Sequence, residues 1–251
     1  MAARRQAPPP PASALRSRVP SAVPVPPPPA PLPGVPLLLA GEPAHLLPAR
    51  ALWLPHRHSL LVADLHWGKA AAFRAAHLPL PSGTTAADLE RLSTALADTG
   101  ATRLIVLGDL WHSRAGRHPD TLATIAAWRA RHATLTIDLV RGNHDRHAGD
   151  PPACWEFGVH DPPLPLGPLT LVHDAAHDAP EAPGYRVGGH LHPHRTLTGP
   201  GRERLRLPCF VVGPTRAVLP AFGAFTGGGM HVPQPGDRHY AIADGDVLPV
   251  D

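Results

Sequence analysis

The sequence predicts an α/β fold, because segments expected to form strands alternate with segments expected to form helices. Runs rich in Leu, Ile and Val predict strands at 59–63, 103–107 and 135–140. The segments between these runs have the apolar spacing of amphipathic helices, at about 84–100 and 120–132. Because a strand–helix–strand order usually gives neighbouring parallel strands, we expect a parallel or mixed sheet with helices outside it.

Local signals define the remaining elements. Thr84 or Thr85 can cap the helix that Gly100 ends. The buried faces of the two longer helices are expected to contain Leu89, Leu92, Leu96, Leu122, Ile125 and Trp128. Before these helices we expect a strand, a turn and a short helix, at 46–54, 55–58 and 68–77. Helical signals fade beyond Pro151, and strands are expected at 169–172, 185–187, 210–212 and, as a hairpin, 240–248.

The first 34 residues differ in composition from the rest. Residues 1–34 are rich in proline, alanine and arginine, and uninterrupted proline runs occur at 8–11 and 26–29. Because proline fixes φ and lacks a backbone donor, we expect a disordered N-terminal arm. Residues 35–251 are numerous enough to bury a core and are expected to form one domain.

The net positive charge of the chain comes from this arm. Of the 23 Lys and Arg residues, four lie in residues 1–41, which contain no acidic residue, so 19 basic residues remain against 20 acidic ones. The body is therefore nearly neutral, whereas strong DNA binders usually carry a basic face.

Two further features bear on the cellular compartment. No apolar stretch approaches the roughly 20 residues that span a bilayer, and no secretory signal is apparent. Cys154 and Cys209 offer no disulfide framework, and both are expected to be small buried apolar residues. We expect a cytoplasmic protein without membrane association.

Four short motifs place metal-ligand side chains directly after predicted strands. They are Asp64-Leu65-His66, Gly108-Asp109, Gly142-Asn143-His144-Asp145 and Gly189-His190-Leu191-His192. The ends of neighbouring strands meet at one edge of a sheet, where α/β proteins build their sites. A set of Asp, Asn and His without cysteine suits Mn, Fe or Zn in a catalytic centre, and not a closed structural zinc site.

These motifs resemble, in the same order, the signature of the calcineurin-like metallophosphoesterase superfamily. Their flanking residues look most like the bacterial DNA ligase-associated metallophosphoesterase family (PdeM). The segments that carry the resemblance are Ala63-Asp64-Leu65-His66-Trp67-Gly68-Lys69, Leu107-Gly108-Asp109-Leu110-Trp111-His112-Ser113, Gly142-Asn143-His144-Asp145-Arg146, Gly189-His190-Leu191-His192-Pro193, Leu207-Pro208-Cys209-Phe210 and Leu219-Pro220-Ala221-Phe222-Gly223.

The resemblance implies a four-layer α/β/β/α sandwich, two divalent metal ions and hydrolysis of phosphodiester bonds. Manganese is the expected metal, with iron or zinc as alternatives. Genes of the family lie beside those of a DNA ligase, a helicase and a predicted exonuclease, so the resemblance implies a nuclease linked to DNA repair with these partners. Two alternatives stay open: a phosphodiesterase or phosphatase acting on small nucleotides, and a non-catalytic scaffold of a repair complex.

The expected ligands divide between two ions. Asp64 and His66 are two residues apart in an extended segment, so they face the same way and can bind one ion together. Asp109 is expected to bridge both ions, because a shared carboxylate offsets the repulsion of two cations about 3.5–4 Å apart. By the resemblance, His190 ligates the second ion and His192 the first.

The other expected roles fall to Asn143 and its neighbours. Asn143 is expected to ligate the second ion through its amide oxygen, and His144 to donate a proton to the leaving group. Asp145 either orients that imidazole or is a surface turn residue. The last metal ligand is expected to be His173, with His177 as the alternative.

Basic and aromatic residues near the motifs are candidates for substrate contacts. Arginine pairs with phosphate through a bidentate fork, and lysine as a point charge. The candidates are Lys69, Arg141, Arg146 and Arg195. His112 is a candidate for contact with the substrate or, equally, for a packing role.

Overall fold

The computed structural model describes residues 32–78, 83–178, 181–201, 203–229 and 232–250. The proline-rich arm expected at 1–34 lies outside the described residues, except for 32–34. Leu32 already packs against the core, so the ordered chain includes this residue just before the first strand.

The first sheet has seven strands, and their order in the sheet is their order in the chain. The strands are β1 (Val35–Leu39), β2 (Glu42–Leu47), β3 (Ala51–Leu54), β4 (Ser59–Val62), β5 (Arg103–Leu107), β6 (Thr136–Val140) and β7 (Phe157–His160). β1 to β4 pair antiparallel, and β4 to β7 pair parallel. The sheet is therefore mixed, and its parallel half contains the strands predicted from the alternation.

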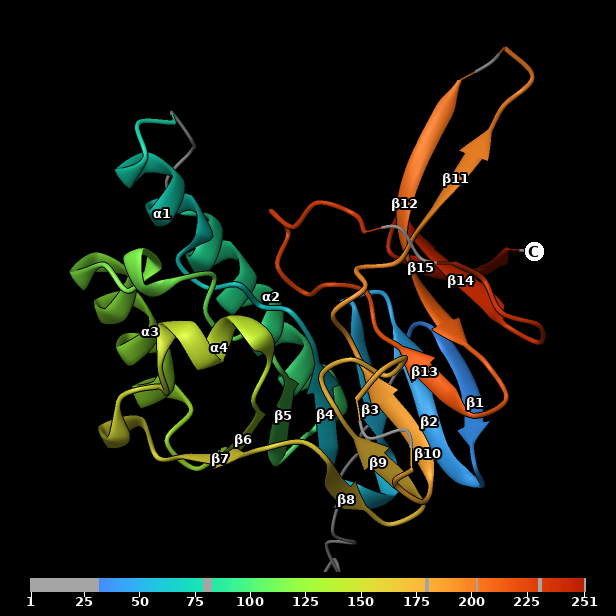
Figure 1. The fold of residues 1–251 in the computed structure, drawn as a ribbon, viewed down its shortest axis with the longest axis horizontal. Helices are drawn as coiled ribbons and strands as arrows, with labels where there is room; N and C mark the ends of the chain where they lie inside the picture. The colour runs from blue at the N-terminus through green and yellow to red at the C-terminus, as the bar shows by residue number, and fades with distance from the viewer. Residues whose placement is uncertain (1–31, 79–82, 179–180, 202, 230–231, 251) are drawn as a thin grey trace, which may run out of the picture. The chain divides into compact units, whose positions relative to one another are not determined.

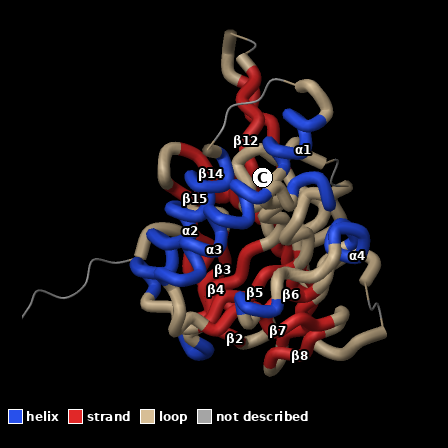
Figure 2. Tube along the Cα trace, turned by 90° about the vertical axis from the view of Figure 1, so that its left-hand side faces the viewer, coloured by secondary structure: helices blue, strands red, loops and turns tan. Residues whose placement is uncertain are grey.

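The second sheet is built from the C-terminal half of the chain in the order β15-β14-β12-β13-β10-β9-β8. Its strands are β8 (Leu164–Leu166), β9 (Leu169–Leu171), β10 (Tyr185–Gly188), β12 (Arg204–Val212), β13 (Arg216–Val218), β14 (Arg238–Ala243) and β15 (Asp246–Val250). β11 (His194–Thr198) pairs only with the first part of β12. The β11–β12 hairpin therefore projects beyond the sheet, as Figures 1 and 2 show.

Helices cover one face of the first sheet, and the second sheet covers the other (Figure 1). Leu92 and Trp128 share a core cluster with Val62, whereas Leu61 and Phe210 share a second cluster between the sheets. The helices are α1 (Lys69–Ala75), α2 (Thr84–Thr99), α3 (Pro119–Arg131) and α4 (Asn143–Ala148), with 3-10 turns η1 (Pro55–Arg57), η2 (Arg114–Gly116) and η3 (Ala153–Trp155).

Of the predicted four-layer α/β/β/α sandwich, the two packed sheets and the helical layer on the first sheet are confirmed, and no α-helix of the described residues forms a layer on the second sheet. The helices lie on the first sheet. Every α-helix in the described part of the chain ends by Ala148, before the first strand of the second sheet begins at Leu164. The outer face of the second sheet carries a smaller cluster in which Cys209 and Val211 pack with the loop residue Ala175. Loops and turns therefore cover that face in the described residues.

Three local expectations are corrected by the structure. The segment 46–54 is not one strand, because Pro48 and the left-handed Arg50 (φ 66°) turn the chain between β2 and β3. The N-cap of α2 is Gly83, with φ 91°, and neither Thr84 nor Thr85. Cys154 is exposed, and only Cys209 is buried.

Candidate metal centre

The predicted site residues lie at the carboxyl ends of strands from both sheets. Asp64 and His66 follow β4, Asp109 follows β5, and Asn143 begins α4 just after β6. The second sheet supplies the residues after β9 and β10, which are His173, His190 and His192. The motifs therefore meet because two sheets end at the same edge, as the strand-end pattern predicts.

Five of these residues adopt the left-handed backbone conformation that only glycine tolerates well. The φ values are 54° for Asp64, 45° for His66, 53° for Asp109, 68° for His190 and 43° for His192. Hydrogen bonds between the loops hold this strained backbone: His66 N–H donates to Asp109 O at 2.9 Å, and His190 N–H donates to Asp64 Oδ2 at 2.9 Å. Strain concentrated at one edge of the sheets is typical of a functional site.

The first ligand group combines Asp64, His66 and His192. Their ligand atoms all lie within 4.8 Å of one another. His192 Nε2 is 3.4 Å from Asp64 Oδ1 and 3.4 Å from His66 Nε2. This is the set that the sequence assigns to the first ion.

The second ligand group combines Asp109, His173 and His190, also within 4.8 Å. His173 Nε2 lies 3.4 Å from Asp109 Oδ1, 3.0 Å from His190 Nδ1 and 3.0 Å from Asn143 Oδ1. Asn143 therefore belongs to the same group through its amide oxygen.

The Asp109 carboxylate lies between the two groups. Its Oδ1 faces His173, and its Oδ2 is 3.8 Å from His66 Nε2. Asp109 is thus the residue whose two oxygens address different groups, which is the geometry of a bridging ligand.

Hydrogen bonding at the far side of the rings shows that this donor set fits cations. His173 Nδ1–H donates to Leu107 O at 3.0 Å, and His192 Nδ1–H donates to Gly227 O at 3.1 Å. The Nε2 atoms of both rings therefore point inward, as in metal-ligating histidines whose other nitrogen binds a carbonyl. In addition, Asp64 Oδ1 is buried and accepts no hydrogen bond. Converging imidazole nitrogens and buried carboxylate oxygens are the donors that a divalent cation would bind, in place of any proton on Nε2.

The pKa shifts show how strongly these groups interact. Burial lowers the pKa of His66 to about 3, against the opposing charge of Asp109, so this imidazole is neutral at pH 7. Burial would also lower the pKa of His173 and of His192, but the carboxylates of Asp109 and Asp64 raise the pKa of His173 to about 9 and raise that of His192. Burial alone would raise the pKa of Asp109, but its hydrogen bond to His173 and the charge of that ring lower it to about 2. Burial, together with the nearby Lys69 ammonium, lowers the pKa of His112 to about 4.

His144 is oriented by a backbone carbonyl and not by Asp145. Its Nδ1–H donates to His112 O at 2.6 Å, and its Nε2 lies 3.9 Å from Asp109 Oδ2. Asp145 is buried and accepts hydrogen bonds from Gly142 N and Trp111 N, at 2.9 and 3.2 Å. Neither role expected for Asp145 matches this position; the carboxylate ties the loop after β6 to the loop after β5.

The structure places His173, and not His177, with the other ligands. The His177 side chain is 80 % exposed and pairs with Asp174 Oδ2 at 2.8 Å. His173 is buried in the second ligand group. The sequence also favours His173, because this residue directly follows the strand predicted at 169–172.

The four basic candidates lie in different surroundings. Arg141 is engaged by Asp150 and Asp161, so its guanidinium is already paired. Arg146 is exposed and lines a cavity of about 220 Å³ together with Asn143, His173 and His190. Lys69 is half-buried beside His66, and Arg195 lies in the β11–β12 hairpin.

Phe73 and Phe225, which the sequence analysis did not single out, lie beside the metal centre. His112 packs face to face with His144 and with Phe73, and Phe73 contacts Phe225. Phe225 and Lys69 line a narrow cavity that reaches His66. Phe225 lies six residues after Leu219, close to a segment of the family resemblance, but single phenylalanines carry no motif.

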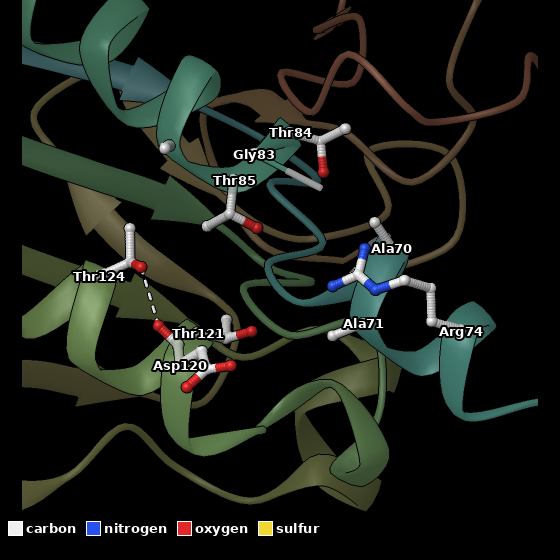
Figure 3. A pocket seen from close by; sticks show the side chains of 10 residues that line it. Ala70, Ala71, Arg74, Gly83, Thr84, Thr85, Asp120, Thr121 and Thr124 are labelled. Atoms are coloured by element: carbon white, nitrogen blue, oxygen red, sulfur yellow. Dashed lines mark hydrogen bonds between the residues drawn. The ribbon is translucent and has the colours of Figure 1, made fainter. Parts of the chain in front are cut away.

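A third cavity, of about 180 Å³, opens between α1, α2 and α3 (Figure 3). Figure 3 shows the Arg74 side chain extending from α1 toward the first turn of α2, where Thr84 and Thr85 also line the narrow cavity at His66. None of the predicted metal ligands lines the cavity between the helices, so it is separate from the metal centre.

Solved structures that match the chain include a nuclease and a phosphoesterase. The crystal structure of nuclease MPE from Pseudomonas putida is 42% identical in sequence, with a TM-score of 0.74 over 86% of this chain and 99% of that chain. The structure of YfcE, a phosphoesterase from E. coli, is 19% identical, with a TM-score of 0.40 over 76% of this chain and 97% of that chain. No family model and no curated protein matches the chain. In the described residues, no helix is both long and apolar enough to cross a membrane.

Proposed function

Because this chain belongs to the ligase-associated family of calcineurin-like metallophosphoesterases, we propose that it is a nuclease that hydrolyses phosphodiester bonds in DNA. The chain is a metal-dependent phosphoesterase. The DNA substrate is the further step, supported by the nuclease to which 86% of the chain aligns.

One observation carries the proposal: two groups of inward-facing ligand atoms share the Asp109 carboxylate between them. We assign Asp64, His66 and His192 to one divalent ion and Asn143, His173 and His190 to the other. A mixed oxygen and imidazole set suits Mn²⁺ first and admits Fe or Zn. When bound, such a pair supplies Lewis-acid stabilisation of charge on the phosphate and a water activated at neutral pH.

The residues around the ligands have distinct tasks in this reaction. His144 Nε2 lies 3.9 Å from the shared Asp109 carboxylate, and the cationic form of this ring is placed to donate its Nε2 proton to the oxygen that leaves phosphorus. His112 O holds the opposite nitrogen of that ring at 2.6 Å, and Asp145 positions the loop that carries it. Arg146, on the cavity beside the second group, is placed to pair with a non-bridging phosphate oxygen.

A small nucleotide diester is the second candidate substrate. The near-neutral body, with 19 basic against 20 acidic residues beyond the arm, favours it over tight duplex binding. Both candidate substrates would be hydrolysed at a phosphodiester bond by the same metal centre.

The test offers one enzyme preparation several substrates. Purified full-length protein with Mn²⁺ would receive a chromogenic diester, a chromogenic monoester, and labelled single- and double-stranded DNA. We expect cleavage of the diester and of DNA, and loss of both in Asp109→Ala but not in Asp98→Ala, a change at an exposed carboxylate. Diester cleavage without DNA cleavage would favour the small substrate, and metal binding without any turnover would favour a scaffold.

We also propose a role in DNA repair. Membership of the ligase-associated family supports it, and the partners we propose in the cytoplasm are a DNA ligase, a helicase and an exonuclease. Affinity purification from the native cell would recover one of these proteins if the association is direct, and their absence from the purified material would contradict it.

A further inference from the structure

A column of near-parallel rings runs from the proposed proton donor toward the surface. The rings of His144 and His112 are 5.6 Å apart at an interplanar angle of 26°, and those of His112 and Phe73 are 5.6 Å apart at 19°. His112 is thereby stacked between the other two rings. Phe73 belongs to α1, so the column joins this helix to the catalytic loops.

Phe225 ends the column at the surface. Its ring contacts Phe73 edge to face, at 6.4 Å and 75°, and 40 % of the residue is exposed. An aromatic side chain left open to water beside a polar site is a ready stacking surface, because ring faces pair favourably with other flat π systems.

The backbone holds Phe225 in place. Gly223 N–H donates to Asp64 O at 3.2 Å, Ala224 N–H donates to Asp88 Oδ1 at 3.2 Å, and Thr226 N–H donates to Gly223 O at 3.3 Å. The turn that carries Phe225 is therefore anchored to a proposed metal ligand. A group that is positioned before binding costs less entropy when it meets its ligand.

The surroundings indicate what stacks there. Phe225, Lys69 and His66 line one narrow cavity of about 10 Å³, so a phenyl ring, a cation and the metal centre are neighbours, and a base would lie on the exposed ring beside this cavity. A nucleotide has the matching parts, a flat base attached through a sugar to a phosphate. Aromatic rings next to positive charge are the usual means of holding single-stranded nucleic acid.

We propose that Phe225, supported by Phe73, stacks an unpaired nucleobase of the strand whose phosphate lies at the metal centre. This inference rests on the proposed phosphodiesterase function and assigns a residue that contacts the base of its substrate. A paired base within a duplex has neighbours on both faces, so only an unpaired base can stack on Phe225.

The experiment uses dinucleoside phosphates, which contain one scissile bond. Four substrates carry both bases, only the 5′ base, only the 3′ base or neither, with an abasic sugar in each empty place. The enzymes are the full-length wild type, Phe225→Ala, Phe225→Trp, Phe73→Leu and the control Leu38→Ala, which truncates an exposed leucine of β1. Rates with Mn²⁺ give kcat/KM for every combination.

We expect removal of one particular base to lower kcat/KM of the wild type by about 5- to 150-fold, the range of one base–aromatic stack. Phe225→Ala should lose a similar factor on the full substrate and lose nothing more when that base is removed, because the two changes delete the same interaction. Phe225→Trp and Leu38→Ala should keep the base dependence, and Phe73→Leu should weaken it.

Other outcomes separate this inference from the function on which it rests. If removal of the base lowers kcat/KM equally in the wild type and in Phe225→Ala, the stacking site is overturned, while the proposed nuclease function stands. Turnover of a simple dialkyl or aryl diester with no turnover of any dinucleotide also overturns it and favours a small-diester enzyme. No turnover of any diester overturns the proposed function itself.

Discussion

Backbone strain and close packing at single residues decide whether the ligand atoms converge. A non-glycine residue with positive φ costs of order 1 kcal/mol or more, and five proposed ligands bear this cost. Neighbouring glycines allow the ligand side chains to come this close to the backbone. A Cβ on Gly108 would lie 2.2 Å from His173 Nδ1, and one on Gly142 would lie 2.3 Å from Asp109 Oδ1.

Gly108→Ala should displace His173 and impair the second ion's site. Gly108 has φ 79°, so alanine there meets both strain and the ring. We expect Mn²⁺ affinity or diester activity to fall by about 10- to 100-fold, the usual effect of disturbing a ligand's support. Gly100→Ala is the matched control, because Gly100 also has positive φ (64°) but a Cβ there meets nothing within 4 Å. Equal metal binding in both variants, measured by calorimetric titration, would contradict the packing argument.

His144→Ala should separate proton donation from metal binding. Loss of a general acid slows a reaction by about 10²- to 10⁴-fold, and most for leaving groups that need a proton. We expect near-normal Mn²⁺ content by elemental analysis, a small loss on a nitrophenyl leaving group and a large loss on an alkyl one. His177→Ala, at an 80 % exposed ring, should change neither. A metal-free His144→Ala protein would make His144 a ligand instead of the acid.

At the scale of elements, α2 and α3 are joined by a hydrogen-bonded chain across their contact. The Trp128 Nε1–H donates to Ser93 Oγ at 2.9 Å, so the Ser93 hydroxyl is left to donate to His132 Nε2, also at 2.9 Å. His132 must then be neutral, with its proton on Nδ1. Burial, followed by the charge of Arg131, lowers the pKa of this histidine from 6.5.

Acid should therefore weaken the contact between these helices. Because the folded pKa of His132 lies below the unfolded value of 6.5, the unfolded chain takes up the proton first as the pH falls. The contribution is fully present above about pH 6.5 and is lost as the pH falls from 6.5 toward the lowered folded value. Urea unfolding at pH 7.5 and 5.5 should show the wild type losing about 1 kcal/mol more than His132→Asn, the net value of one hydrogen bond. Equal losses would show that His132 does not titrate against this bond.

At the scale of the whole molecule, the metal centre connects the two sheets. Asp64, His66 and Asp109 follow strands of the first sheet, whereas His173, His190 and His192 follow strands of the second. Ions bound by both sets would hold the sheets together at this edge, and this linkage exists only in the folded chain.

Metal should consequently raise the melting temperature. At a free Mn²⁺ concentration 100 times Kd, binding stabilises the fold by about 2.7 kcal/mol, which corresponds to roughly 5–10 °C for a chain of this size. Scanning calorimetry of chelator-treated protein with and without Mn²⁺ measures the shift. Asp109→Asn keeps the side-chain shape but removes the shared charge. Mn²⁺ should therefore raise the melting temperature of this variant much less. An equal shift in both proteins would mean that the stabilising ion binds elsewhere.

The sequence by itself determined the α/β class and most of the site. A strand end followed by Asp, Asn or His is a local pattern, and parallel strands bring such ends together whatever loops intervene. The ligand candidates Asp64, His66, Asp109, Asn143, His190 and His192 could therefore be listed before any coordinates, and the structure gathers them at one edge.

The tertiary structure decided what depends on contacts between distant segments. The sequence favours His173 over His177 as a ligand, but only the fold shows that His173 reaches Asn143, 30 residues away in the chain. Asp145 binds the backbone of Trp111, 34 residues away, and Phe225 lies against Phe73 of another element. Local pattern encodes hydrophobic period and turn chemistry, but not the partner a side chain meets across the fold. That partner is set by the packing of the sheets, and it is what makes a histidine a ligand or a phenylalanine a stacking surface.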